Sequence, residues 1–352
     1  MDTTSSPKIR WGIIGCGQIA HDKALPGILN STNAELVALA DPDPARLDRA
    51  HAAAPQAGAY ARPEELLADD RVQAVYIATP NHMHAPNTIA AAQAGKHVLC
   101  EKPMAMNAAE GQAMVDAAAQ AGVQLMIAYM TLFNPAYQAA QQVVASGALG
   151  ELVFVRGRHS YTIQPARISP AASWRLDRTQ GGGPLMDVAV YPTMSLRYLT
   201  NQRIKNLTAT GTTRRLHERT DFDSVVYSFL LEDGTPGVIE GCFTHSSSLI
   251  ELEGTAGRLE LRGHITQAVA GRLDVSVHFP GQRHVGQKAS HEIIPEGLPH
   301  YYNYLREIEH FSNCIAAGEE PVSSGRRAVA ELRVADAVRE SLRSGQRIEI
   351  EW

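Results

Sequence analysis

Asp187 and Tyr191 are the only ionisable side chains in the stretch GGGPLMDVAVYPT, residues 181–193, where three glycines precede an apolar run. If the run is helical, a spacing of four residues places the two side chains on one face, one turn apart. A carboxylate beside a phenol is half of a site that could move a proton to or from a substrate. The plain alternative is a loop that closes onto an amphipathic helix and leaves a satisfied polar pair beside the core.

The hydrophobic pattern of the first 130 residues predicts the elements that could position such a site. Apolar runs, nearly continuous as in strands covered on both faces, occur at residues 9–15, 35–41, 72–80, 96–103 and 123–130. Alanine-rich helical patterns lie between them, at residues 18–30, 44–54, 84–94 and 107–121. This alternation predicts an α/β fold with a doubly wound parallel sheet over residues 1–130.

A glycine-rich turn joins the first predicted strand to the first predicted helix. Its residues follow the pattern G-x-G-x-x-A and are Gly15, Cys16, Gly17, Gln18, Ile19 and Ala20. The first glycine permits the tight turn, the second lets a pyrophosphate approach the N–H groups of the helix N-terminus, and the alanine allows close packing. The pattern alone is weak, but between a strand and a helix it predicts an NAD(P)-binding Rossmann domain.

The second predicted strand ends in Asp41, where a carboxylate would accept hydrogen bonds from the adenosine ribose hydroxyls. Because this carboxylate would repel a 2′-phosphate, the sequence favours NAD. Arg46 follows shortly afterwards and could reach a 2′-phosphate, which keeps NADP as the alternative. Asp41 could instead serve only the turn Asp-Pro-Asp-Pro, or cap the helix behind it.

Two further loops leave the carboxyl ends of strands, the edge at which such sheets bind ligands. The cofactor-binding candidates in these loops are Thr79, Pro80, Asn81, His82, Glu101 and Lys102. Because His82 and His84 have no acidic residue nearby in sequence, we interpret them as loop or capping residues and expect no metal there. Lys102 alone would be a solvated charge, but it projects from the same edge as the glycine turn. Pro103 behind it could follow a cis peptide bond.

The composition of the 352 residues is that of an ordinary globular protein, with 44% hydrophobic and 20% charged residues. A net charge of −5 gives no reason to expect nucleic acid or a membrane surface as partner. The polar first ten residues lack the apolar segment of a secretory signal, and no run could span a membrane. The cysteines are far apart, so we expect reduced thiols in a cytoplasmic protein and no metal site built from Cys16, Cys100, Cys242 and Cys314.

Residues 131–352 are expected to form a second α/β domain. Strand-like runs joined by turn residues occur at 152–162, 206–213, 224–234, 236–243, 249–263 and 272–279. Helical patterns follow at about residues 300–316 and 325–343, and residues 347–352 are predicted as a last strand. So many consecutive strands suit a large open sheet.

The chain resembles the Gfo/Idh/MocA oxidoreductases over essentially its whole length. The glycine turn, Asp41 and the stretches TPNHMH, CEKP and GGGPLMDVAVY occur in the order of that family. The resemblance implies an N-terminal Rossmann domain followed by an α/β domain with a large open, mostly antiparallel sheet. It also implies that this sheet carries substrate on one side and commonly an oligomer interface, of a homodimer or homotetramer, on the other.

The resemblance extends to the site residues. Much of the family has a histidine where this chain has Tyr191, and Ala189 replaces a usual glycine; the tyrosine form resembles the glucose–fructose oxidoreductase and dihydrodiol dehydrogenase branch. The segment that begins with Trp174 and Arg175 is similar to that of sugar-oxidising members, so both residues are substrate-binding candidates. Residues 129–133 lack the arginine common in the equivalent segment, which points to a different substrate pocket.

The catalytic residues implied are Lys102, Asp187 and Tyr191. Oxidation of a carbinol needs a base that removes the hydroxyl proton while hydride leaves the carbon. Tyrosine has an unperturbed pKa of about 10, too high for such a base, and an ammonium within about 4–6 Å lowers it. We therefore assign proton transfer to Tyr191, electrostatic support and hydroxyl binding to Lys102, and orientation of the sugar hydroxyl or of Lys102 to Asp187. Lys102 as the base stays open, because coupled groups share their titration. The glycines at 181–183 would let backbone approach the nicotinamide.

These assignments predict an NAD(P)-dependent dehydrogenase or reductase acting on a sugar, at C1 of an aldopyranose, or on a related cyclic polyol. Dihydrodiol-type oxidation of a cyclic diol is the alternative substrate class. A transhydrogenase on tightly held NADP is a variant that Asp41 disfavours. A non-catalytic dinucleotide-binding sensor on the same fold would have lost the proton-transfer residues, which are present here, and no signature of an NAD-dependent glycosidase is found.

Overall fold

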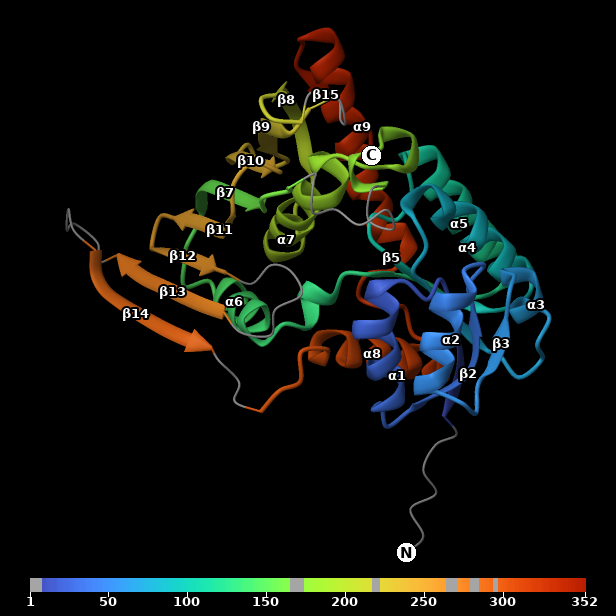
Figure 1. Cartoon of the computed structure of the whole chain (residues 1–352). Helices are drawn as coiled ribbons and strands as arrows, with labels where there is room; N and C mark the ends of the chain where they lie inside the picture. Colours follow the sequence, from blue (N-terminus) through green and yellow to red (C-terminus); the bar gives the residue numbers. More distant parts are fainter. Residues whose placement is uncertain (1–7, 165–173, 217–221, 264–270, 279–284, 294–296) are drawn as a thin grey trace, which may run out of the picture. The chain divides into compact units, whose positions relative to one another are not determined.

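The computed structural model describes residues 8–164, 174–216, 222–263, 271–278, 285–293 and 297–352. The chain divides into two compact units, Met1–Met130 with Pro299–Val329, and Thr131–Leu298 with Ala330–Trp352 (Figure 1). The prediction placed all of 131–352 in the second domain, whereas residues 299–329 pack with the first unit. Residues 1–7 belong to the start that was predicted to lack a secretory signal, and residue 279 to a predicted strand. Both lie outside the described residues.

A parallel sheet forms the centre of the first unit, in the order β3-β2-β1-β4-β5-β6. Its strands are β1 (Ile9–Ile14), β2 (Ala34–Ala40), β3 (Gly58–Tyr60), β4 (Ala74–Ile77), β5 (His97–Glu101) and β6 (Leu125–Ala128). The order reverses between β1 and β4, the point at which a doubly wound sheet binds its ligand. The predicted doubly wound sheet is confirmed.

Helices connect these strands, and right-handed crossovers place those on either side of the reversal on opposite faces. The helices are a π-helix (Ala20–Ala24) continued by α1 (Leu25–Leu29), then α2 (Pro44–Ala53), α3 (Pro63–Leu67), α4 (His84–Gln93) and α5 (Ala108–Ala121). Side-chain caps set two of their starts: Asp43 accepts from two N–H groups of α2, and Asn107 from that of Glu110 in α5. These caps lie where the sequence predicted helix starts.

Helix α8 (Tyr302–Ala317) explains why the chain returns to the first unit. It packs against α1, β1 and β2. Trp11 of β1 is fully buried and donates its indole N–H to Ser312 Oγ at 3.2 Å, and its ring meets that of Phe311 edge to face. A Cβ on Gly27 would lie 2.9 Å from Ile308, so α1 and α8 approach closely because Gly27 has no side chain.

The second unit contains a mostly antiparallel sheet in the order β14-β13-β12-β11-β7-β10-β9-β8-β15, in which only β7 and β10 pair in parallel among the described strands. Its strands are β7 (Leu152–Ser160), β8 (Ile204–Thr212), β9 (Ser224–Leu231), β10 (Pro236–Cys242), β11 (Ser247–Gly254), β12 (Gly257–Arg262), β13 (Gly271–His278), β14 (Val285–Ile293) and β15 (Ile348–Glu349). The large open sheet is confirmed. The predicted run 249–263 divides into β11 and β12, and β14 was not predicted.

Helices line one face of this sheet. They are α6 (Pro135–Ala145), which contacts β12 and β13, α7 (Val190–Thr200), which contacts β7 and β11, and the part of α9 (Gly325–Ser344) that packs on β8. A Cβ on Gly157 of β7 would lie 2.7 Å from Pro192 of α7, so glycine permits this contact. The opposite face carries a network of ion pairs, whose members are Arg156, Glu251, Glu253, Arg258, Glu260 and Arg262. Among all described helices, none has the length and apolar character needed to cross a membrane.

Glu307 of α8 gives this fold a pH-dependent weakness. It is fully buried, and neither carboxylate oxygen has a hydrogen-bond partner among the described residues. Burial, and secondly the charge of Glu101, hold its pKa well above the ordinary value of 4.5. Since its folded-state pKa is raised, its contribution to stability is complete below the unfolded pKa and is lost as pH rises toward the folded pKa.

We therefore expect Glu307→Gln to stabilise the protein increasingly as pH rises, because the amide cannot ionise. The gain in free energy of unfolding should be roughly 1–3 kcal/mol larger at pH 8 than at pH 5. Urea unfolding at a series of pH values measures it, with the exposed Glu319→Gln as control. A pH-independent gain would show that Glu307 does not titrate on unfolding.

Candidate active site

The glycine turn leaves space where a dinucleotide would need it. Gly15 has φ 91°, and a Cβ there would lie 2.7 Å from the carbonyl oxygen of Ala78, so only glycine fits. A Cβ on Gly17 would meet nothing within 4 Å, beside the start of the helical segment 18–29. This open position fits a pyrophosphate at the helix N-terminus. Burial raises the pKa of the Cys16 thiol to about 12, so that residue contributes its backbone to the turn and not a reactive thiolate.

The Asp41 side chain holds both the glycine turn and the turn that follows β2. Its buried carboxylate accepts hydrogen bonds from the N–H of Cys16 at 2.7 Å and from that of Asp43 at 2.9 Å. A carboxylate has about four acceptor positions, so ribose hydroxyls can bind in addition. Arg46, which the sequence offered as a partner for the 2′-phosphate of NADP, forms an exposed ion pair with Asp43 at 3.2 Å.

His84 ties together the two loops that follow β4 and β5. Its Nε2 lies 2.9 Å from the carbonyl oxygen of Thr79, and its Nδ1 lies 2.7 Å from that of Pro103. His84, which was expected to be a loop or capping residue, starts α4, is buried and lies between two carbonyls. Burial outweighs these carbonyls and lowers the pKa of His84 to about 4, so the ring is neutral at pH 7. A neutral ring has one N–H and therefore donates to only one of the two carbonyls. Its neighbour His82 leaves Nδ1 buried without a partner among the described residues.

The lysine candidate follows a buried carboxylate. Glu101 accepts a hydrogen bond from the Tyr76 hydroxyl at 2.7 Å through Oε1 and from the backbone N–H of Lys102 at 3.1 Å through Oε2. Lys102 is half-buried, and its bond to Pro103 is cis, as the sequence allowed. The end of β5 is therefore held by Glu101 and Tyr76.

In the second unit, Asp187 and Tyr191 are buried on a continuous helical stretch. A π-helix (Leu185–Ala189) leads directly into α7, which confirms the predicted helical run. The Tyr161 hydroxyl donates to Asp187 Oδ2 at 2.5 Å, and Arg175 Nε lies 3.6 Å from the same oxygen. Burial and the Asp187 charge raise the pKa of Tyr161 well above its ordinary value, so Tyr161 is a donor to the carboxylate.

Tyr161 and His159 lie at this site but were not predicted as site residues. The His159 ring stands edge to face with that of Tyr191, with centroids 5.3 Å apart. The alternation of a strand was the available signal, because Gly157 and His159 of β7 and Tyr161 just beyond it share one side, and Gly157 meets α7.

Packing within the second unit explains the three glycines at residues 181–183. Gly181 and Gly183 have φ 83° and 107°, and a Cβ on Gly182 would lie 2.4 Å from the carbonyl oxygen of Trp174. Gly183 N–H also donates to the Arg175 carbonyl at 2.9 Å. The glycines thus let residues 174–177 lie against the start of the helix. The Arg175 guanidinium stacks 4.7 Å from the Trp174 ring centroid.

The predicted site residues therefore form two groups. The first unit brings its candidates to the carboxyl edge of the parallel sheet: Gly15, Cys16, Gly17, Gln18, Ile19, Ala20, Asp41, Thr79, Pro80, Asn81, His82, Glu101 and Lys102. The second unit brings Trp174, Arg175 and Asp187 together and places Tyr191 one turn beyond Asp187.

We expect the buried His84 to destabilise the fold in acid, because protonation places a positive charge on a buried ring. Because its folded-state pKa lies below the ordinary value of 6.5, its contribution to stability is present above pH 6.5 and is lost as pH falls through 4. The stability advantage of the wild type over His84→Gln should shrink by roughly 3 kcal/mol between pH 7 and pH 4. Denaturant unfolding of both proteins measures it, with His51→Gln on α2 as control; an advantage that stays constant with pH would contradict the assignment.

Two family models match the chain. The model described as an oxidoreductase family with NAD-binding Rossmann fold, of the Gfo/Idh/MocA type, covers residues 9–129. The model of the Gfo/Idh/MocA C-terminal domain covers residues 137–260. Together they span more than half of the chain.

Individual relatives match over nearly full length. The chain is 31% identical to D-xylose 1-dehydrogenase (NADP(+)) 2 of Haloferax volcanii, over 97% of this chain and 99% of that protein. It is 33% identical to trans-1,2-dihydrobenzene-1,2-diol dehydrogenase of Mus musculus, over 89% and 91%. Aldose-aldose oxidoreductase from Caulobacter crescentus has the same fold with a TM-score of 0.86 at 28% identity, over 97% and 100%. The chain belongs to the Gfo/Idh/MocA family of oxidoreductases and carries its NAD-binding Rossmann domain.

Proposed function

We propose that this protein is an NAD(P)-dependent dehydrogenase or reductase that acts on a CH–OH group of a sugar, at C1 of an aldopyranose, or of a related cyclic polyol. The observation that carries the proposal is the buried Asp187, which Tyr161 and Arg175 hold one turn before Tyr191. A protein that only senses a dinucleotide has no need of a buried carboxylate and phenol on one helix of its second unit.

Tyr191 is assigned the transfer of the substrate hydroxyl proton, and Lys102 the role of favouring the phenolate and binding that hydroxyl. Asp187 Oδ2 already accepts from Tyr161 and faces Arg175, so the carboxylate is better suited to orient a hydroxyl than to remove its proton. The nicotinamide, when bound, supplies the acceptor or donor of hydride. Lys102 stays the alternative base.

The substrate class is supported by the relatives' names and by the candidate substrate-binding residues Trp174 and Arg175. One relative is named a xylose dehydrogenase and one structural neighbour an aldose-aldose oxidoreductase. The Trp174 ring with Arg175 stacked on it offers an aromatic face and N–H donors, the groups that suit a polyhydroxylated ring. A cyclic diol is the second candidate, favoured by the relative from mouse that is named a dihydrodiol dehydrogenase.

NAD is the proposed cofactor, because the Asp41 carboxylate occupies the position that a 2′-phosphate would approach. The relative named as an NADP(+) enzyme keeps NADP as the alternative. We further propose a homodimer or homotetramer formed through the charged face of the nine-stranded sheet, and a cytoplasmic location in keeping with four buried free cysteines.

The activity can be tested by mixing the protein with NAD or NADP and a panel of aldoses, cyclic polyols and cyclic diols, and following the absorbance of the reduced nicotinamide. We expect turnover with one substrate class, and a loss of kcat/KM of about 10²–10⁴-fold in Lys102→Ala and in Tyr191→Phe. Tyr198→Phe on the same helix is the matched control and should retain activity. Tight dinucleotide binding without turnover across the panel would support the sensor instead.

The cofactor preference can be tested with Asp41→Asn, which removes the charge and keeps a side-chain oxygen as acceptor. We expect the ratio of kcat/KM for NADP to that for NAD to rise at least about tenfold, because the repulsion of a 2′-phosphate is lost. A thermal unfolding scan controls for damage to the glycine turn, whose Cys16 N–H bonds to Asp41. An unchanged ratio would remove Asp41 from cofactor selection.

A further inference from the structure

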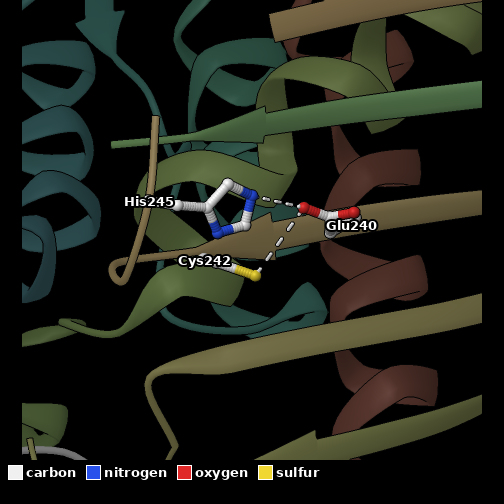
Figure 2. A group of neighbouring side chains, drawn as sticks. All are labelled: Glu240, Cys242 and His245. Carbon is white, nitrogen blue, oxygen red and sulfur yellow. Dashed lines mark hydrogen bonds and ion pairs between the residues drawn. The ribbon is translucent and has the colours of Figure 1, made fainter. Parts of the chain in front are cut away.

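Three side chains with metal-ligating atoms converge at the end of β10. Glu240 and Cys242 are two residues apart on this strand and therefore share a face, and His245 follows in the turn before β11. Figure 2 shows the three side chains pointing toward one another. Their face is opposite the one that packs on the helices, because Gly241 between them contacts Ala189.

The spacing of the three ligand atoms suits one small cation. His245 Nε2 lies 2.9 Å from Glu240 Oε1, Cys242 Sγ lies 3.9 Å from the same oxygen, and all three atoms lie within 4.8 Å of one another. Bonds of about 2.0–2.3 Å in a tetrahedral zinc site separate neighbouring ligand atoms by roughly 3.3–3.8 Å. The observed spacings bracket that range, so small rotations of the side chains complete the geometry.

Neighbouring groups hold the His245 ring and the backbone of Cys242. The Thr244 hydroxyl lies 3.4 Å from Nδ1 of His245, on the ring nitrogen that does not face Glu240. The backbone N–H of Cys242 donates to Ser160 Oγ at 3.1 Å. A contact to the second ring nitrogen, such as that of Thr244, fixes the tautomer and the direction of a histidine ligand. The His245 and Glu240 side chains are 48% and 30% exposed in the single chain, so a cation can enter from solvent before the proposed oligomer covers this face.

We propose that Glu240, Cys242 and His245 form a binding site for a divalent transition-metal cation, with Zn²⁺ as the best match and water as the fourth ligand. A set of one thiolate, one imidazole and one carboxylate suits zinc, whereas Mg²⁺ and Ca²⁺ prefer oxygen ligands. The negative charges of the carboxylate and the thiolate would balance the charge of the bound metal. Arg158 lies opposite Glu240 in the β7–β10 register, and its positive charge makes the site weaker than a closed structural zinc site.

The proposal departs from the sequence-based expectation of no metal, which rested on the distance between the cysteines. The ligands instead lie within six residues, in the pattern E-x-C-x-x-H, and contain a single cysteine. The site lies on the face of the sheet opposite α7 and Tyr191, so its role is to hold the turn after β10 against the sheet rather than to act in hydride transfer.

The test uses the full chain, without a histidine tag and freed of metal, titrated with Co²⁺ and then with Zn²⁺. We expect one Co²⁺ per chain with a near-ultraviolet thiolate-to-cobalt charge-transfer band, which Zn²⁺ displaces. Cys242→Ser should abolish the band, and His245→Ala and Glu240→Gln should each weaken binding at least about tenfold. Cys314→Ser is the matched control and should retain binding: Cys314 Sγ lies 3.5 Å from His310 Nε2, but no carboxylate completes that pair among the described residues.

Circular dichroism of each variant separates loss of the site from loss of the fold, and the exposed His245 can be replaced without opening the core. Failure of the folded wild type to bind Co²⁺ or Zn²⁺ in a stoichiometric amount would overturn the proposal. So would an unchanged charge-transfer band in Cys242→Ser. In either case the three residues would be an ion pair beside a buried thiol.

Discussion

The burial of the Asp187 carboxylate is the constraint on which the second unit depends. A buried ionised group without hydrogen bonds or a countercharge is costly, and removing one partner of a buried pair costs about 3–5 kcal/mol. Tyr161 beyond β7 and Arg175 from a separate loop both reach the same carboxylate oxygen. The loop can come close enough because Gly182 has no side chain. One charge thus accounts for the phenol, the guanidinium and the glycines around it.

Buried polar groups organise the first unit in the same manner. Asp41 accepts from two backbone N–H groups and so fixes the glycine turn relative to β2. The His84 ring lies between a carbonyl of the loop after β4 and one of the loop after β5, and Glu101 joins the start of one of these loops to Tyr76. The glycine turn and the loops after β4 and β5 are therefore held by side chains from neighbouring segments. Such preorganisation lets a cofactor bind without first ordering the loops.

Because side chains alternate along each strand, the two faces of the nine-stranded sheet carry different sets of residues. On β7 and just beyond it, Gly157, His159 and Tyr161 share the face that meets α7. The residues between them, together with Glu240 and Cys242 of β10, share the face of the ion-pair network. A shift of one residue in register would exchange the two faces. Glycines at the contacts with α7 and the π-helix keep the register, because larger residues would clash there.

The sequence alone determined the doubly wound sheet, the open second sheet and the family, but β3, α3, α6 and β14 were not predicted. Strand periodicity, glycine turns and helix caps are local signals, and the residues around Gly15, Lys102 and Tyr191 carry them in a fixed order. The start of α2 at residue 44 was predicted for the same reason, but its cap is Asp43 and not Asp41, which the sequence offered as a cap. Which unit α8 would join was not, since it depends on Trp11 meeting a helix some 300 residues away in sequence.

Only the tertiary structure decided what surrounds each candidate residue. Tyr161 reaches Asp187 across 26 residues of chain, and His84 reaches Pro103 across 19. Such contacts depend on how separate segments pack, and no local pattern encodes them. The Glu240, Cys242 and His245 cluster is close in sequence, but its face and spacing follow from the strand and the turn after it. The sequence thus supplied the reactive groups, and packing decided which of them meet.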